Sequence, residues 1–191
     1  SDPHFYDMIE ITTEDFIKLE LEMKIPFNFL QLSYNADIIK ANSLKFREDV
    51  TYGEDFDFAM RALSYGDKIS VNNEITYFYI QHESSLINTS KFKRFDFIPV
   101  LEDLADFYEK QNLNDLASLI HTSRIPRAIF GNMNYFFVND YDFDDVMSKM
   151  KDLDLFDKLS KFEGDKKFGL KVKLFLLNPK LYYKMWKKFN R

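Results

Sequence analysis

The sequence predicts an α+β chain that is predominantly helical, with a short β-sheet segment followed by a C-terminal helical bundle. Apolar residues recur three and four positions apart through most of the second half, which is the spacing of one helix face. β-forming residues cluster only near the middle, at 68–71 and 75–80. Of the 191 residues, 46% are hydrophobic, enough for one full core or one core with a helical appendage.

Two helices are expected near the N-terminus. The first begins at about Thr13, because two threonines followed by two acids are typical of a helix start, and Pro26 ends it. The second is short, covers residues 35–42 and turns Ile38 and Ile39 inward.

The middle of the chain combines a third helix with the two expected strands. This helix follows Gly53-Glu54-Asp55 and stops near Gly66, which is expected to be its left-handed C-terminal cap. Residues 68–71 and 75–80 then place β-forming side chains on either side of an Asn-Asn turn. They are predicted to form the short sheet.

From Phe95 onward the pattern is almost wholly helical. Apolar side chains recur at helical spacing in four segments, Phe95–Gln111, Leu113–Ser123, Gly131–Phe137 and Val146–Phe162. Gly164 and Gly169 are expected to break the helical run. The last segment, 170–191, is expected to be a helix broken or kinked near Pro179.

The composition excludes several classes of protein. A formal net charge of −5 is not the basic footprint of a nucleic-acid binder, so no nucleic-acid partner is expected. Cysteine is absent, which excludes disulfides and zinc–thiolate sites. No apolar run of about eighteen residues could span a bilayer, and the predicted location is cytoplasmic. The 21 Phe and 11 Tyr are interpreted as core packing in preference to a carbohydrate-stacking surface.

Acidic residues gather at the start of the helix that follows Gly53. Glu54 and Asp55 lie where free N–H groups and the helix dipole favour negative charge, and Asp57 adds a third carboxylate. The dipole lowers the pKa of a carboxylate, whereas neighbouring acids raise it. For this tripeptide alone, stabilisation of the helix start by about 0.3–1 kcal/mol per charge explains the pattern without a catalytic role.

A series of short motifs surrounds this tripeptide. In chain order they are Phe29–Tyr34, Asp37–Ile39, Leu44–Phe46, Gly53–Asp55, Arg61, Lys68-Ile69, Tyr77–Tyr79 and His82–Ser85. The series resembles the acceptor-side half of a family 2 glycosyltransferase. In that family an aromatic-x-x-Leu-x-Tyr segment, a short helix and Leu-x-Phe precede a Glu-Asp pair. A helix with an Arg, a Lys-Ile strand and a Tyr-x-Tyr strand ending near His and Ser follow it.

The resemblance implies roles for five residues. Asp55 corresponds to the family's catalytic base, which takes the proton from an acceptor hydroxyl, and Glu54 contacts the acceptor or tunes the charge of Asp55. Tyr34, His82 and Ser85 correspond to substrate-binding positions. Some relatives place a metal or pyrophosphate contact at the position of His82, but a polar residue that closes a strand is at least as good an interpretation.

The chain also departs from the family pattern. Processive members carry Gln-x-x-Arg-Trp, whereas residues 81–85 here read Gln-His-Glu-Ser-Ser, which indicates transfer of a single sugar. Arg61 either faces a carboxylate or simply solvates its helix, and the second interpretation is preferred.

The resemblance further implies a nucleotide-binding half that would precede residue 1. That half carries the Asp-x-Asp pair that holds Mg²⁺ or Mn²⁺ on the donor diphosphate. The acidic run Asp140–Asp145 contains the same Asp-x-Asp pattern, but it is interpreted as a solvated loop or helix N-cap. We therefore expect this chain alone to bind no cofactor and to have little or no activity. On this basis residues 1–92 complete the catalytic domain of a parent protein, and residues 93–191 form a helical C-terminal region.

The C-terminal segment admits two interpretations. Residues 170–191 mix apolar and aromatic side chains with seven Lys or Arg. An interfacial helix would place Trp186 and the tyrosines at headgroup depth and the lysines against anionic lipid, at the inner face of the cell membrane. The preferred alternative is a terminal helix packed on the preceding bundle.

Two functions from different classes remain open at this point. In the first, the parent protein is an inverting, non-processive glycosyltransferase. It would move a sugar from a nucleotide-diphospho-sugar to a cell-surface polysaccharide or a lipid-linked acceptor. In the second, the chain is a non-enzymatic helical module that binds carbohydrate or protein.

Overall fold

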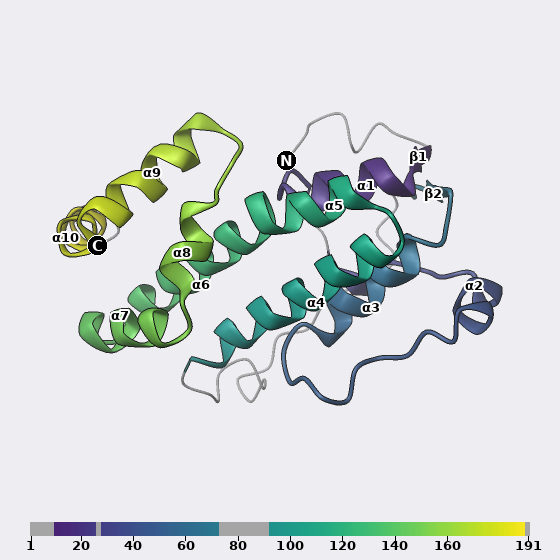
Figure 1. Ribbon diagram of the computed structural model, residues 1–191, viewed down its shortest axis with the longest axis horizontal. Helices are drawn as coiled ribbons and strands as arrows, with labels where there is room; N and C mark the ends of the chain where they lie inside the picture. Colours follow the sequence, from purple (N-terminus) through teal and green to yellow (C-terminus); the bar gives the residue numbers. More distant parts are fainter. Residues whose placement is uncertain (1–9, 26–27, 73–91, 190–191) are drawn as a thin grey trace. The chain divides into compact units, whose positions relative to one another are not determined.

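The fold is predominantly helical, with one small antiparallel sheet, as the sequence predicts. The computed structural model describes residues 10–25, 28–72 and 92–189, and Figure 1 shows their helices and strands along the chain. The chain divides into two compact units, residues 1–119 (unit 1) and 120–191 (unit 2). This division lies further along the chain than the boundary at 92/93 expected from the family resemblance.

The sheet of unit 1 pairs two three-residue strands. β1 (Glu10–Thr12) runs antiparallel to β2 (Lys68–Ser70), with Ile11 opposite Ile69. β2 confirms the first predicted strand, and β1 was not predicted. The second predicted strand, 75–80, lies outside the described residues.

α1 (Thr13–Leu21) begins at the predicted residue for the predicted reason. The Thr12 hydroxyl accepts a hydrogen bond from the backbone N–H of Asp15 at 3.1 Å, and acids occupy the first turn. The chain leaves the helix through Met23, whose φ of 55° lies in the left-handed region. The helix has therefore already ended before Pro26.

The segment between α1 and α3 contains two short helical pieces. The single 3₁₀ turn η2 covers Phe29–Gln31, and α2 covers Ala36–Ala41. Asn35 caps α2 by accepting a hydrogen bond from the Asp37 N–H at 2.9 Å. The two isoleucines of α2 that were expected to face inward are half-buried.

α3 (Glu54–Leu63) confirms the helix predicted after Gly53. Its C-terminal end differs from the prediction, because Ser64 closes it in a right-handed conformation and Gly66 does not adopt a positive φ. The carbonyl of Gly66 instead accepts a hydrogen bond from the Thr13 hydroxyl. Gly66 thus joins the start of α1 to the loop before β2.

Three further elements complete unit 1: η4 (Lys93–Asp96), α4 (Phe97–Lys110) and α5 (Asn114–Leu119). α4 packs against α3 and α5, and α1 packs against α3 and α5, so the four helices share one core. The hydroxyl of Tyr108, which is fully buried, donates to the backbone carbonyl of Met60 at 3.1 Å. This bond links α4 directly to α3.

Unit 2 is helical throughout its described part. Its elements are η5 (Ile120–Arg124, a π turn), α6 (Ile125–Val138), α7 (Phe143–Asp152), α8 (Leu155–Ser160), α9 (Lys166–Leu177) and α10 (Pro179–Phe189). α8 packs against α6, α7 and α9, and α9 packs against α10. The buried apolar side chains of α6, α8 and α9 supply its core.

Several helix ends in unit 2 differ from those predicted. The end expected at Ser123 falls inside the run formed by η5 and α6. The helix expected over 146–162 is split at Asp154, whose φ of 54° interrupts it. Gly164 does separate two helices, whereas Gly169 lies inside α9, where a Cβ would meet the Phe162 ring at an ordinary 3.6 Å. Gly169 therefore does not break the helix.

The chain changes direction at Asn178, as the nearby proline led us to expect. Pro179 opens α10, and the Asn178 side chain accepts a hydrogen bond from the Leu181 N–H at 2.9 Å. No helix in 10–25, 28–72 or 92–189 is long and apolar enough to cross a membrane.

Candidate functional site

The candidate site is built on the N-terminus of α3, which Gly53 positions. Gly53 is the N-cap residue and has a φ of 91°, a conformation that favours glycine. A Cβ at this position would lie 2.5 Å from Cδ2 of Phe97 and 3.5 Å from Cγ1 of Val100. The ring of Phe97 also contacts the ring of Phe56 edge-on at 5.2 Å. The first turn of α3 is therefore held closely against the start of α4.

Asp55 occupies the second residue of α3 and is half-buried. Its Oδ1 accepts a hydrogen bond from the backbone N–H of Phe56 at 2.7 Å. Burial raises the pKa of Asp55 above its ordinary value, and the charge of Glu54 raises it further, while backbone hydrogen bonds oppose the change. The result is a carboxylate that holds a proton more strongly than a solvated aspartate does.

Tyr34 lies within electrostatic range of Asp55, although the two residues are on separate elements. Burial is the main reason that the pKa of Tyr34 rises to about 12, and the negative charge of Asp55 adds to the rise. The Tyr34 ring packs edge-on against Phe58 of α3 at 5.4 Å between centroids. Its hydroxyl is buried, yet no described residue forms a hydrogen bond with it. The structure thus places an unsatisfied hydroxyl near a carboxylate of raised pKa.

Phe46 adds an accessible aromatic surface to the same cluster. Its ring stacks on that of Phe58 at 4.2 Å between centroids and 10° between planes, and the residue is 50% exposed. Among the aromatic residues whose burial the structure describes, Phe46 is the most exposed, because the other rings are buried or half-buried. The aromatic content therefore serves mainly the core, as predicted, and one ring next to the site is left open.

Arg61 contradicts the preferred interpretation that it solvates its helix. Its Nε donates to Oδ2 of Asp57 at 2.8 Å, and the Asp57 side chain is only 2% exposed. The guanidinium also lies over the Phe107 ring, 4.5 Å from the centroid. The third acid of the helix start is thus paired within α3, separate from Glu54 and Asp55, and the contact of Arg61 with Phe107 links this pair to α4.

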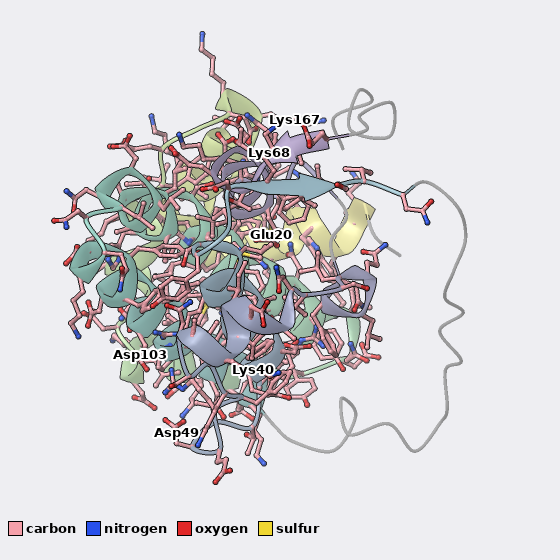
Figure 2. All side chains as sticks on the ribbon, turned by 90° about the vertical axis from the view of Figure 1, so that its right-hand side faces the viewer. Glu20, Lys40, Asp49, Lys68, Asp103 and Lys167 are labelled. Carbon is pink, nitrogen blue, oxygen red and sulfur yellow. The ribbon has the colours of Figure 1, made fainter. Side chains whose placement is uncertain are left out.

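Arg47 forms two ion pairs that were not predicted from the sequence. Its guanidinium reaches Asp49 at 2.6 Å and Asp103 of α4 at 2.7 Å. Figure 2 shows Asp49 and Asp103 on the same side of unit 1. The adjacent acids at 48 and 49 are visible in the sequence, but no local signal points to a partner 56 residues away. This bridge ties the segment that carries Phe46 to α4.

The remaining site predictions divide into two groups. The structure brings Tyr34, Glu54 and Asp55 together in unit 1, whereas His82 and Ser85 lie outside the described residues. In the described part of the chain, no three His, Cys, Asp or Glu side chains are grouped to hold a metal ion. The described residues therefore do not by themselves fit a divalent cation.

The acidic run 140–145 has the helix-capping role proposed for it. Asp142 is the N-cap of α7, and its Oδ1 accepts hydrogen bonds from the N–H groups of Asp144 at 2.8 Å and Asp145 at 3.1 Å. These acids stabilise the start of a helix in unit 2.

Comparison of the chain with protein-family models, curated proteins and solved structures gave no match.

Proposed function

We propose that this chain is the acceptor-side part of an inverting, non-processive glycosyltransferase in which Asp55 is the catalytic base. The observation that carries the proposal is the environment of Asp55. Its carboxylate is half-buried at a helix N-terminus, has a raised pKa and lies beside the unsatisfied hydroxyl of Tyr34. A half-buried carboxylate within electrostatic range of an unsatisfied hydroxyl is suited to binding and activating a sugar hydroxyl.

The proposed reaction gives Asp55 one task. As an acceptor hydroxyl oxygen attacks the anomeric carbon of a nucleotide-diphospho-sugar, Asp55 takes the hydroxyl proton. The new glycosidic bond forms while the bond to the diphosphate breaks, so the anomeric configuration inverts and the nucleotide diphosphate leaves with the bonding electrons. A positioned base of this kind accelerates a reaction by about 10²–10⁴-fold. The raised pKa of Asp55 makes it a better proton acceptor than a solvated carboxylate.

Tyr34 and Phe46 would position the acceptor sugar. An outward movement of Tyr34 would let its buried hydroxyl donate to an acceptor oxygen and gain the hydrogen bond that the described residues do not provide. The open face of Phe46 can stack on a sugar ring, with Phe58 behind it as support. Glu54, whose charge already acts on Asp55, is placed to contact other acceptor hydroxyls.

The donor belongs to another part of the parent protein in this proposal. The family resemblance assigns the nucleotide and its Mg²⁺ or Mn²⁺ mainly to a nucleotide-binding half that precedes these residues. The acceptor would be a saccharide or a lipid-linked saccharide used to build cell-surface polysaccharide, at the cytoplasmic face of the membrane. His82 and Ser85 would complete the substrate contacts.

The test uses the parent protein that the proposal requires, in which a nucleotide-binding half precedes this chain. Transfer of labelled sugar is measured with a panel of nucleotide-diphospho-sugars and lipid-linked saccharides, for the wild type and Asp55→Asn. We expect the substitution to reduce kcat by at least about 10²-fold. Asp144→Asn is the matched control, because Asp144 is also the second residue of a helix and is exposed.

Two outcomes would count against the proposal. Equal rates for the wild type and Asp55→Asn would exclude Asp55 as the base. Rapid transfer by the 191-residue chain alone would show that the donor site has been assigned to the wrong part of the protein. Saccharide binding without any transfer would instead favour the non-enzymatic module, for which Phe46 is the candidate contact.

A further inference from the structure

We infer that α9 and α10 dock on the surface of an anionic lipid bilayer, through five exposed apolar side chains that are accompanied by lysines. This surface belongs to unit 2 and is independent of the proposed glycosyl transfer. Figure 1 shows the two helices at the C-terminal end of the chain, with α10 seen end-on. The five side chains, here called the apolar stripe, are Leu170, Leu174, Leu177, Leu181 and Met185.

The stripe follows one face of each helix. Leu170, Leu174 and Leu177 recur at the four- and three-residue spacing of an α-helix and are 59%, 43% and 84% exposed. Leu181 and Met185 are one turn apart on α10 and are 54% and 46% exposed. Of the nine large apolar side chains that are exposed in the described residues, these five lie within sixteen consecutive positions. Single exposed apolar side chains scattered over a surface are ordinary, whereas a cluster of this kind marks an interaction surface.

The core-facing sides of the two helices are already occupied. On α9, Val172 and Phe175 are buried. On α10, the Tyr183 ring lies 4.6 Å from that of Phe137, and Trp186 lies 5.6 Å from the same ring of α6. These contacts hold both helices on the core of unit 2. The apolar stripe faces away from that core and takes no part in it.

This arrangement bears on the two interpretations of the aromatic residues in 170–191. One interpretation placed Trp186 and the tyrosines among lipid headgroups, and the preferred one packed the helix on the preceding bundle. In the structure Tyr183 stacks on Phe143 at 5.0 Å, and Tyr182 packs on Phe130 at 5.5 Å. The aromatic side chains therefore attach the helices to the protein, and the leucines remain for the bilayer.

Positive charge accompanies the stripe. Residues 166–191 contain nine of the 26 Lys and Arg in the chain and none of its 31 Asp and Glu, although the whole chain carries −5. With 3.6 residues per turn, Lys166 and Lys173 flank the α9 leucines on one side, and Lys167 and Lys171 flank them on the other. All four are exposed. On α9, apolar side chains bordered on both sides by lysines match the interior and the headgroups of an anionic bilayer.

A bilayer explains this surface better than the other polyanions. A nucleic acid would engage the lysines but leave the leucines in water. Membrane docking by an amphipathic helix uses both features at once, because binding strength grows with the buried apolar area and with the attraction to anionic lipid. The proposal therefore predicts that binding requires both the leucines and the negative charge of the lipid.

The test is co-sedimentation of the 191-residue chain with vesicles of phosphatidylcholine, with and without phosphatidylglycerol. We expect binding to the anionic vesicles that weakens as salt is raised, and little binding to the neutral ones. The double substitution Leu177→Gln and Leu181→Gln should weaken binding by at least about tenfold. Both side chains are exposed, so circular dichroism and thermal unfolding should be unchanged.

Two controls make the test specific. Val138→Gln replaces an apolar residue that is 66% exposed outside the stripe and should leave vesicle binding unchanged. Trp186→Phe keeps the packing on α6 and should also leave binding unchanged. In the wild type, the emission of Trp186 should not shift to shorter wavelength when vesicles are added, because its ring is packed on protein.

Three results would overturn the proposal. The first is failure of the wild type to bind anionic vesicles. The second is equal binding by the wild type and the double leucine variant. The third is a dimer in sedimentation velocity that the double variant abolishes, without any vesicle binding by either protein, since the stripe would then be a contact between two copies of the chain.

Discussion

The ring of Phe97 fills the space that a side chain on Gly53 would need. These residues lie 44 positions apart in the sequence, at the starts of α4 and α3, and a Cβ on Gly53 would approach Phe97 Cδ2 to 2.5 Å. The contact matters for the proposed site, because Gly53 directly precedes Glu54 and Asp55. Packing between two helix starts thus determines where the candidate base lies.

Gly53→Ala is expected to destabilise the protein by about 2–4 kcal/mol. The substitution forces an alanine into a left-handed conformation, φ 91°, and places its Cβ against Phe97, so both backbone strain and overpacking contribute. Urea unfolding followed by circular dichroism measures the change. Gly131→Ala is the control, because Gly131 lies inside α6 with no atom within 4 Å of an added Cβ. It should stabilise the protein by roughly 0.5–1 kcal/mol.

Tyr34→Phe is expected to stabilise the fold by about 1 kcal/mol and to weaken acceptor binding. The buried hydroxyl of Tyr34 has no hydrogen-bond partner among the described residues, so removing it relieves a desolvation cost. Tyr108→Phe is the matched control. Its hydroxyl is bonded to the Met60 carbonyl, and its loss should destabilise by about 1 kcal/mol. A loss of stability in Tyr34→Phe comparable to that in Tyr108→Phe would show that Tyr34 is a structural residue.

Asp55→Asn is expected to raise the free energy of unfolding at neutral pH, with a gain that disappears in acid. The folded-state pKa of Asp55 is raised, so the native protein binds this proton more tightly than the unfolded chain does. Stability is then lost as the pH rises from the ordinary value of 3.8 through the folded-state pKa, and the substitution removes that loss. Urea titrations at several pH values test this. A destabilising effect at neutral pH would contradict it.

Local signals predicted the helix starts well. The hydroxyl of Thr12 and the acids after it lie within one turn, and Gly53 followed by acids is equally local. Several unpredicted features depend on contacts that the local sequence pattern does not show. β1 exists because Ile11 pairs with Ile69, and α9 continues through Gly169, where a neighbouring ring packs. The charge and spacing of the acids at the start of α3 could not show that Asp57, and not Glu54 or Asp55, is buried in an ion pair.

Arg61→Ala is expected to cost about 3–5 kcal/mol of stability. Its removal leaves the carboxylate of Asp57, which is 2% exposed, without its ion-pair partner in the interior. Lys161→Ala removes a partner at the same helical spacing, from Asp157, but both side chains of that pair are more than half exposed. This control should change stability by less than about 0.5 kcal/mol. Similar costs for the two substitutions would mean that the Asp57–Arg61 pair is solvated in solution.

Phe46→Ala separates acceptor positioning from catalysis. The ring is half-exposed and stacks on Phe58, so its removal should raise KM for the acceptor by about tenfold while kcat changes little, which is the pattern for loss of uniform binding. Phe46→Tyr keeps the ring and should restore KM.

Asp55→Asn should show the opposite pattern, with kcat reduced and acceptor binding retained, because a base acts only on the reacting proton. Loss of kcat in both variants would show that Phe46 supports the position of α3 and does not bind the acceptor. If saccharide binding depends on Phe46 and no transfer occurs in any variant, the chain is a binding module.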